Sequence, residues 1–118
     1  MMSNHVFEVT NDNFEQAVMQ AELPILVEFT ADWCPPCKVL APIIEALAVT
    51  YENQMRVGSV DSDLYMDLTE RFGVLGLPTL ILFKKGVPVE QMVGFMPRHK
   101  IEARLTRQVA LVDTTKVT

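Results

Sequence analysis

The chain has 118 residues, of which 49% are hydrophobic and 21% are charged. These values suit a single folded domain spanning residues 1–118, and they exclude collagen-like, disordered and disulfide-scaffold proteins. Ten lysines and arginines against fifteen aspartates and glutamates give a net charge of −5, with no basic cluster. We therefore expect neither nucleic acid nor an anionic membrane surface as the main partner.

The first part of the chain alternates between strand and helix patterns. Residues 5–9 have the pattern of a short strand, and Thr10 is a suitable N-cap for a helix that follows. Pro24 ends that segment. Residues 25–29 form a nearly continuous apolar run, which is typical of a strand covered on both faces. Glu28 is the one residue that interrupts this run.

The longest helix pattern follows two closely spaced cysteines. Its apolar stripe comprises Leu40, Ile43, Ile44, Leu47 and Tyr51. Pro42 lies inside this pattern, and we expect it to bend the helix because it removes a backbone donor. Residues 55–60 then predict a strand. Apolar residues at helical spacing predict a short helix that ends at Gly73.

The last part combines a hairpin with a final helix. Residues 79–83 and 89–93 predict two strands joined by a turn at residues 85–86. Pro97 can open a helix. The apolar face of that helix comprises Ile101, Leu105 and Val109. Residues 112–118 show no pattern and are expected to fray.

The predicted order of elements is β-α-β-α-β-α-β-β-α. Strands joined by helices pair in parallel through right-handed crossovers, whereas the final hairpin adds antiparallel strands. The predicted fold class is therefore α/β, with a mixed central sheet of about five strands sandwiched by four helices, and a core over about residues 5–111.

Cys34 and Cys37 are the only two cysteines, and they enclose two prolines. A disulfide between them closes a loop too small to add much stability. A zinc site usually needs four ligands, and the only histidines, His5 and His99, lie far off in the sequence. A structural disulfide and half of a zinc site are thus the weaker alternatives. The spacing favours redox chemistry, with no metal and no bound cofactor.

Cys34 falls where a predicted strand ends and a helix begins, and the unpaired N–H groups there favour a thiolate. We therefore expect Cys34 to attack substrate and Cys37, one turn further in and more buried, to resolve the mixed disulfide. Pro35 and Pro36 have no N–H, which leaves that of Cys37 as a donor to the sulfur. With fewer donors than a Gly-Pro loop supplies, the couple should be more reducing, which we state as a hypothesis.

These residues belong to a longer pattern, and the chain resembles a thioredoxin over roughly residues 5–111. The matching segments are residues 25–29, 31–38, 41–42, 72–74, 77–79, 83–86 and 93–94. Their combination, in order and at thioredoxin spacing, is much more specific than an isolated Cys-x-x-Cys. The resemblance implies a thioredoxin fold and the activity of a protein-disulfide reductase.

The resemblance also implies a role for individual residues. Cys34 corresponds to the nucleophile and Cys37 to the resolving thiol. Trp33 corresponds to an exposed aromatic residue beside them, and the alternative is a tryptophan in the core. Pro78 corresponds to a cis-proline facing the cysteines, which would leave the backbone of Leu77 free to pair with an extended substrate.

The remaining residues of the predicted substrate groove are Pro35, Pro36, Gly94 and Phe95. Gly94 would let the substrate approach closely, because it has no side chain. Phe95 and the following Met96 either line the same groove or belong to the core or an ordinary loop.

Three positions besides the two prolines depart from the family pattern. Glu28 stands where thioredoxins have a buried aspartate, and it is predicted to transfer a proton at Cys37. Burial should raise the pKa of Glu28, although a solvent-facing edge position is the alternative. Ser59 stands where many thioredoxins have a lysine, and the loss of that cation should raise the pKa of the acid further. Thr30 stands where many have an aromatic residue.

The leading hypothesis is a monomeric, cytoplasmic thiol–disulfide oxidoreductase that reduces protein disulfides. The chain lacks a nucleotide-binding glycine motif, so a thioredoxin reductase or an equivalent electron donor is an expected partner. Residues 1–5 lack the features of a secretory signal, which disfavours an oxidase or isomerase in an oxidising compartment. The alternatives are a binding or chaperone module without turnover, and a redox partner for one dedicated substrate.

Overall fold

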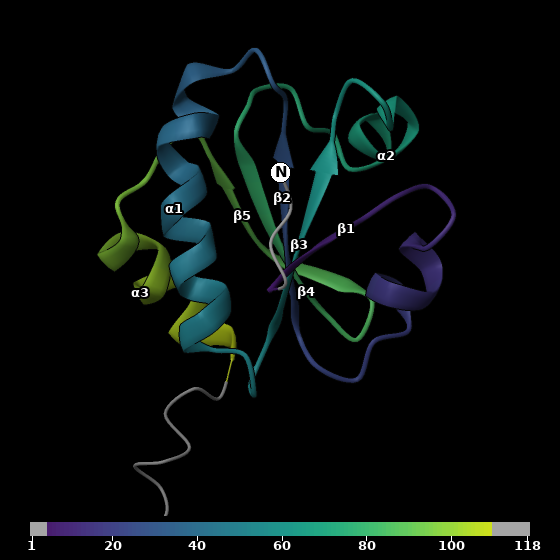
Figure 1. Ribbon diagram of the computed structural model, residues 1–118. Helices are drawn as coiled ribbons and strands as arrows, with labels where there is room; N and C mark the ends of the chain where they lie inside the picture. Colours follow the sequence, from purple (N-terminus) through teal and green to yellow (C-terminus); the bar gives the residue numbers. More distant parts are fainter. Residues whose placement is uncertain (1–4, 110–118) are drawn as a thin grey trace, which may run out of the picture.

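The computed structural model describes residues 5–109, and Figure 1 shows a central sheet with helices on both faces. The elements are β1 (Val6–Glu8), η1 (Glu15–Met19), β2 (Ile25–Thr30), α1 (Pro35–Thr50), β3 (Arg56–Asp61), α2 (Met66–Arg71), β4 (Thr79–Lys84), β5 (Val87–Val93) and α3 (Arg98–Gln108). The predicted order of strands and helices is confirmed. The predicted frayed tail, residues 112–118, lies outside the described residues.

The strands form one mixed sheet in the order β1-β3-β2-β4-β5. β3 pairs in parallel with both β1 and β2, because η1 and α1 return the chain to the same end of the sheet. β4 runs antiparallel to β2, and β5 runs antiparallel to β4. Figure 1 shows α1 and α3 on one face of the sheet and η1 and α2 on the other. The predicted α/β class and mixed sheet are confirmed.

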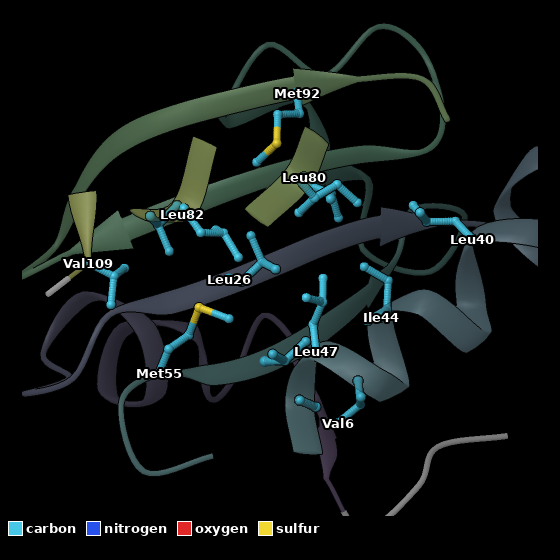
Figure 2. Close-up of a cluster of buried hydrophobic side chains, with 14 residues drawn as sticks. Val6, Leu26, Leu40, Ile44, Leu47, Met55, Leu80, Leu82, Met92 and Val109 are labelled. Carbon is cyan, nitrogen blue, oxygen red and sulfur yellow. The ribbon is translucent and has the colours of Figure 1, made fainter. Parts of the chain in front are cut away.

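Side chains of alternate residues in the central strands pack into two separate hydrophobic cores, one on each face of the sheet. Leu26, Leu80 and Leu82 pack on the face covered by α1 and α3, as Figure 2 shows. Ile25, Val27 and Phe29 pack on the face covered by η1 and α2. Because side chains of a strand alternate between faces, Glu28, two residues after Leu26, points to the α1 face. This alternation directs a carboxyl group toward the helix that begins with the cysteine motif.

The first helix differs from the prediction of an α-helix capped by Thr10. The structure has a five-residue π-helix, η1, instead. The Asn13 N–H donates to Thr10 Oγ1 at 3.1 Å, and the Thr10 N–H donates to Asn13 Oδ1 at 2.8 Å. These reciprocal bonds close the turn that precedes η1, because short polar side chains bond readily to nearby backbone. Thr10 therefore closes the turn before η1 and is not the N-cap of that helix.

The remaining boundary differences are small. β3 begins at Arg56 rather than at residue 55, and β5 begins at Val87 rather than at residue 89. β5 thus includes Pro88, which is tolerated because β5 is an edge strand with a register irregularity nearby. Pro42 lies inside α1, as predicted.

Candidate active site

The two cysteines lie at the junction of the β2–α1 loop and α1. Cys34 is the N-cap of α1, with an extended backbone (φ −95°, ψ 105°), and Cys37 lies in the first turn of the helix. A disulfide joins them, with their Cα atoms 5.2 Å apart. The Cys37 N–H donates to Cys34 Sγ at 3.3 Å. One backbone N–H at this end of α1, that of Cys37, thus points toward the sulfur of Cys34, where it favours a thiolate.

Pro35 and Pro36 occupy the first two helical positions, which confirms their predicted placement. Their missing N–H groups would be unpaired at this end of a helix in any case, so neither proline interrupts α1. Cys37 is therefore the first residue of the helix that can donate a backbone hydrogen bond. Both proline side chains are exposed.

The prediction that Cys37 is more buried than Cys34 is wrong for this disulfide form. Each cysteine exposes only 2% of its surface. The two residues form a small cluster with Ala31, and Leu77 packs against it. Cys34 is therefore covered as fully as Cys37. Burial therefore does not distinguish the two cysteines. Any difference in their reactivity must come from the groups around them.

The loop before β4 has the predicted cis peptide bond, between Leu77 and Pro78. Two hydrogen bonds hold this loop: Thr79 Oγ1 donates to the Gly76 carbonyl at 2.6 Å, and the Gly94 N–H donates to the Pro78 carbonyl at 2.7 Å. The second bond brings the end of β5 next to the cis-proline loop. The loop therefore presents Leu77 beside the cysteines in a defined conformation.

Gly94 has a φ of +87°, a conformation that residues with a side chain rarely adopt. A Cβ atom added there would meet no heavy atom within 4 Å, so the space above Gly94 is open. Phe95 is exposed, whereas Met96 packs against the core on the α1 and α3 face. Of these two residues, only Phe95 is available at the predicted groove.

Trp33 exposes 65% of its surface, which excludes the alternative of a core tryptophan. Its indole Nε1–H donates to Asp63 Oδ2 at 2.9 Å, so the ring is held although it is exposed. Asp63 was not predicted to hold Trp33. Thirty residues separate the two partners, and no local pattern relates them. Leu75, which is fully exposed near the cis-proline loop, was also missed.

Glu28 exposes only 5% of its surface, which excludes a solvent-facing edge position. Its neighbour in register on β3 is Ser59, which is also buried and brings no charge. Burial, and secondarily the negative charge of Glu45, raises the pKa of Glu28 to about 7. This group can therefore gain and lose a proton close to neutral pH.

Glu28 and Cys37 both line a cavity of about 610 Å³, which we call the Cys37 cavity. It lies between the first half of α1 and the neighbouring sheet strands. Its lining includes Glu28, Thr30, Cys37, Ala41, Glu45 and Ser59. Cys34 is absent from this lining. The two cysteines therefore have different surroundings: Cys37 adjoins a cavity with a buried acid, and Cys34 adjoins the exposed Trp33.

Asp61 and Asp63, whose spacing resembles that of metal ligands, form part of a turn. Asp61 Oδ1 accepts hydrogen bonds from the N–H groups of Asp63 and Leu64, at 2.9 and 3.3 Å. Within residues 5–109, no group of three or more histidine, cysteine or acidic residues is placed to hold a metal ion.

None of the helices in the described part of the chain is both long and apolar enough to cross a membrane.

A disulfide-bonded cysteine pair at the start of a helix, packed beside a cis-proline loop on a five-stranded mixed sheet, defines the class of thiol–disulfide oxidoreductases with the thioredoxin fold. Comparison with known proteins gives the family. The model of the thioredoxin family matches residues 5–107, and the chain belongs to that family. Thioredoxins are protein-disulfide oxidoreductases, and this chain is one of them.

Curated relatives agree over most of the chain. A thioredoxin of Alicyclobacillus acidocaldarius is 41% identical over 97 residues, which cover 82% of this chain and 91% of the relative. A thioredoxin of Pseudomonas aeruginosa is 37% identical over 108 residues, covering 92% of this chain and all of the relative. A thioredoxin of Porphyra purpurea is 33% identical over 105 residues, or 89% of this chain and 98% of the relative.

Proposed function

We propose that the protein reduces disulfide bonds of other proteins, with Cys34 as the nucleophile, Cys37 as the resolving thiol and Glu28 as the acid that accepts and returns the Cys37 proton. The observation that supports this assignment best is the shared Cys37 cavity, which adjoins Cys37 and Glu28 but not Cys34. Of the two cysteines, only Cys37 therefore shares a cavity with the buried acid.

The proposed reaction has two exchange steps. The Cys34 thiolate attacks one sulfur of a substrate disulfide, forms a mixed disulfide and releases the other substrate sulfur as a thiolate. Cys37 then loses its proton to the Glu28 carboxylate and attacks Cys34 Sγ. The Cys34–Cys37 bond forms, the bond from Cys34 to the substrate breaks, and the second substrate sulfur leaves as a thiolate. Two electrons pass from the dithiol to the substrate.

The proposed substrate groove consists of Trp33, Pro35, Pro36, Leu77, Pro78, Gly94 and Phe95. An extended segment next to a cysteine of the substrate would pair with the backbone at Leu77 and pass over the open space at Gly94. Exposed Trp33 and Phe95 would supply apolar contacts on either side. Disulfide-containing proteins are thus the proposed substrates. A thioredoxin reductase or an equivalent donor would restore the dithiol, and a reducing cytoplasm would suit the cycle.

The direct test is the reduction of insulin disulfides by dithiothreitol, followed by turbidity, with and without catalytic amounts of the protein. We expect a clear acceleration by the unaltered chain and none above the background rate by Cys34→Ser, since serine cannot form the mixed disulfide. If the folded protein cycles between dithiol and disulfide yet does not accelerate the reaction, a general reductase is ruled out. That result would favour a dedicated partner or a binding module.

The hypothesis that the two prolines make the Cys34–Cys37 couple more reducing can be tested at Pro35. In Pro35→Gly, an added N–H near Cys34 Sγ should stabilise the thiolate and shift the reduction potential to a more oxidising value, by roughly 10–30 mV. Equilibration with glutathione buffers measures the potential. Pro88→Gly, in edge strand β5, is the matched control and should leave it unchanged. A Pro35→Gly potential that is unchanged or more reducing would contradict the hypothesis.

A further inference from the structure

A second carboxyl group reaches the Cys37 cavity from α1. Cys37, Ala41 and Glu45 follow one another at intervals of four residues and all line the cavity, so they form one stripe along the helix. The small side chain of Ala41 separates the other two. Glu45 is partly exposed and Glu28 is buried, so the cavity connects a buried acid to one in contact with solvent.

The charges around this cavity are unbalanced. The charged side chains that line it come from β1, β2, the β2–α1 loop, α1 and β3: Glu8, Glu28, Asp32, Lys38, Glu45 and Asp61. Lys38 is the only cation among these, and it is exposed. β4, which also pairs with β2, places the uncharged Leu80 opposite Glu28. Ser59, beside Glu28 in the sheet, offers no positive charge. Negative charge on a nearby carboxylate therefore opposes ionisation of Glu28, and among the described residues that line the cavity no buried cation offsets it.

Among the surrounding carboxylates, Glu45 is the one whose charge raises the pKa of Glu28. Glu45 also lies on the same helical stripe as the thiol that Glu28 is proposed to deprotonate. A base whose proton affinity is closer to that of a thiol accepts the thiol proton more readily. An added negative charge in the cavity thus strengthens Glu28 as a base toward Cys37.

We propose that Glu45 is a positioning residue for the proton step: its carboxylate, in the Cys37 cavity, makes Glu28 a stronger base toward Cys37. The inference rests on the proposed role of Glu28 and adds a residue to it. In the resolving step the Cys37 proton moves to Glu28, and Glu28 later releases it to solvent. Glu45 neither gains nor loses a bond.

The test is the pH dependence of the resolving step, measured between pH 5 and 9 as the rate at which a preformed mixed disulfide with a small peptide is released. In Glu45→Gln, the acidic limb should move to lower pH by a few tenths of a unit, and the plateau rate should fall roughly two- to fivefold. Glu45→Asp keeps the negative charge, so the position of its acidic limb and its plateau rate should both lie close to those of the unaltered protein. Glu70→Gln removes an exposed carboxylate on α2, outside the cavity lining, and should change neither.

A second readout follows Glu28 itself. The protonated carboxyl band of Glu28, identified by infrared difference against Glu28→Gln, should titrate at lower pH in Glu45→Gln. If that midpoint does not move, the inference about Glu45 is overturned, while loss of the acidic limb in Glu28→Gln would still support the proposed function. If Glu28→Gln keeps the acidic limb of the unaltered protein, the proposed role of Glu28 fails and the inference about Glu45 fails with it.

Discussion

A Cys37→Ser variant is expected to stop halfway through the reaction and to retain its substrate as a covalent mixed disulfide. Cys34 remains at the N-terminus of α1, where the backbone N–H of residue 37 still points at its sulfur. The first exchange therefore proceeds. The serine hydroxyl cannot attack Cys34 Sγ to form a disulfide, so the second exchange is lost. Turnover should fall by roughly 10³-fold or more.

The trapped species is measured by intact mass spectrometry under non-reducing conditions, after incubation with a disulfide-bearing peptide. The expected mass is that of the variant plus one half of the peptide, and dithiothreitol should release it. Cys34→Ser is the matched control and should show much less adduct. The two cysteines are equally buried in the disulfide form, so this experiment decides between them. If Cys34→Ser forms more adduct than Cys37→Ser does, the two assigned roles are reversed.

Replacing Glu28 by glutamine is expected to remove a large part of the pH dependence of stability. The pKa of Glu28 rises from 4.5 to about 7 on folding, chiefly because of burial. Folded protein therefore holds this proton more tightly than the unfolded chain. The stabilisation is complete below the unfolded value of 4.5 and is lost as the pH rises through the folded value of about 7. The total amounts to about 3 kcal/mol.

Urea unfolding of the oxidised protein at pH 5 and pH 8 measures this effect. In Glu28→Gln, which keeps the size of the side chain but cannot ionise, the difference in unfolding free energy between these pH values should shrink by about 2–3 kcal/mol. Glu70→Gln removes the same charge from an exposed position and should leave the difference nearly intact. An equal pH dependence in Glu28→Gln and the unaltered protein would show that Glu28 ionises as freely in the folded state as in the unfolded state.

The buried acid illustrates how much of the site a sequence can predict. The apolar residues on both sides of Glu28 predicted a covered strand, and its 5% exposure confirms this prediction. The start of α1 at the cysteine motif was also predicted, because an apolar strand ends just before the motif and a helical stripe follows it, and the first turn of a helix tolerates two prolines. The cis bond at Pro78 came from the resemblance to thioredoxins, since a proline alone does not determine its isomer.

The predictions that failed depended on local competition or on packing. Thr10 and Asn13 bond to each other's backbone and close a turn, and the first helix follows as the π-helix η1, which begins at Glu15. Position within the helix suggested that Cys34 would be the more exposed cysteine. Ala31 and Leu77 cover both residues instead, and these neighbours come from different parts of the chain.

The sequence by itself determined the order of strands and helices, the place of the cysteines at a helix start, and the burial of Glu28. All of these depend on residues close together in the chain, where periodicity and local hydrogen bonding act. Only the tertiary structure decided which distant residues meet: Asp63 with the indole of Trp33, and Glu45 with Glu28 around the Cys37 cavity. Such meetings depend on how α1 and the loops pack on the sheet, and no spacing along the chain encodes that packing.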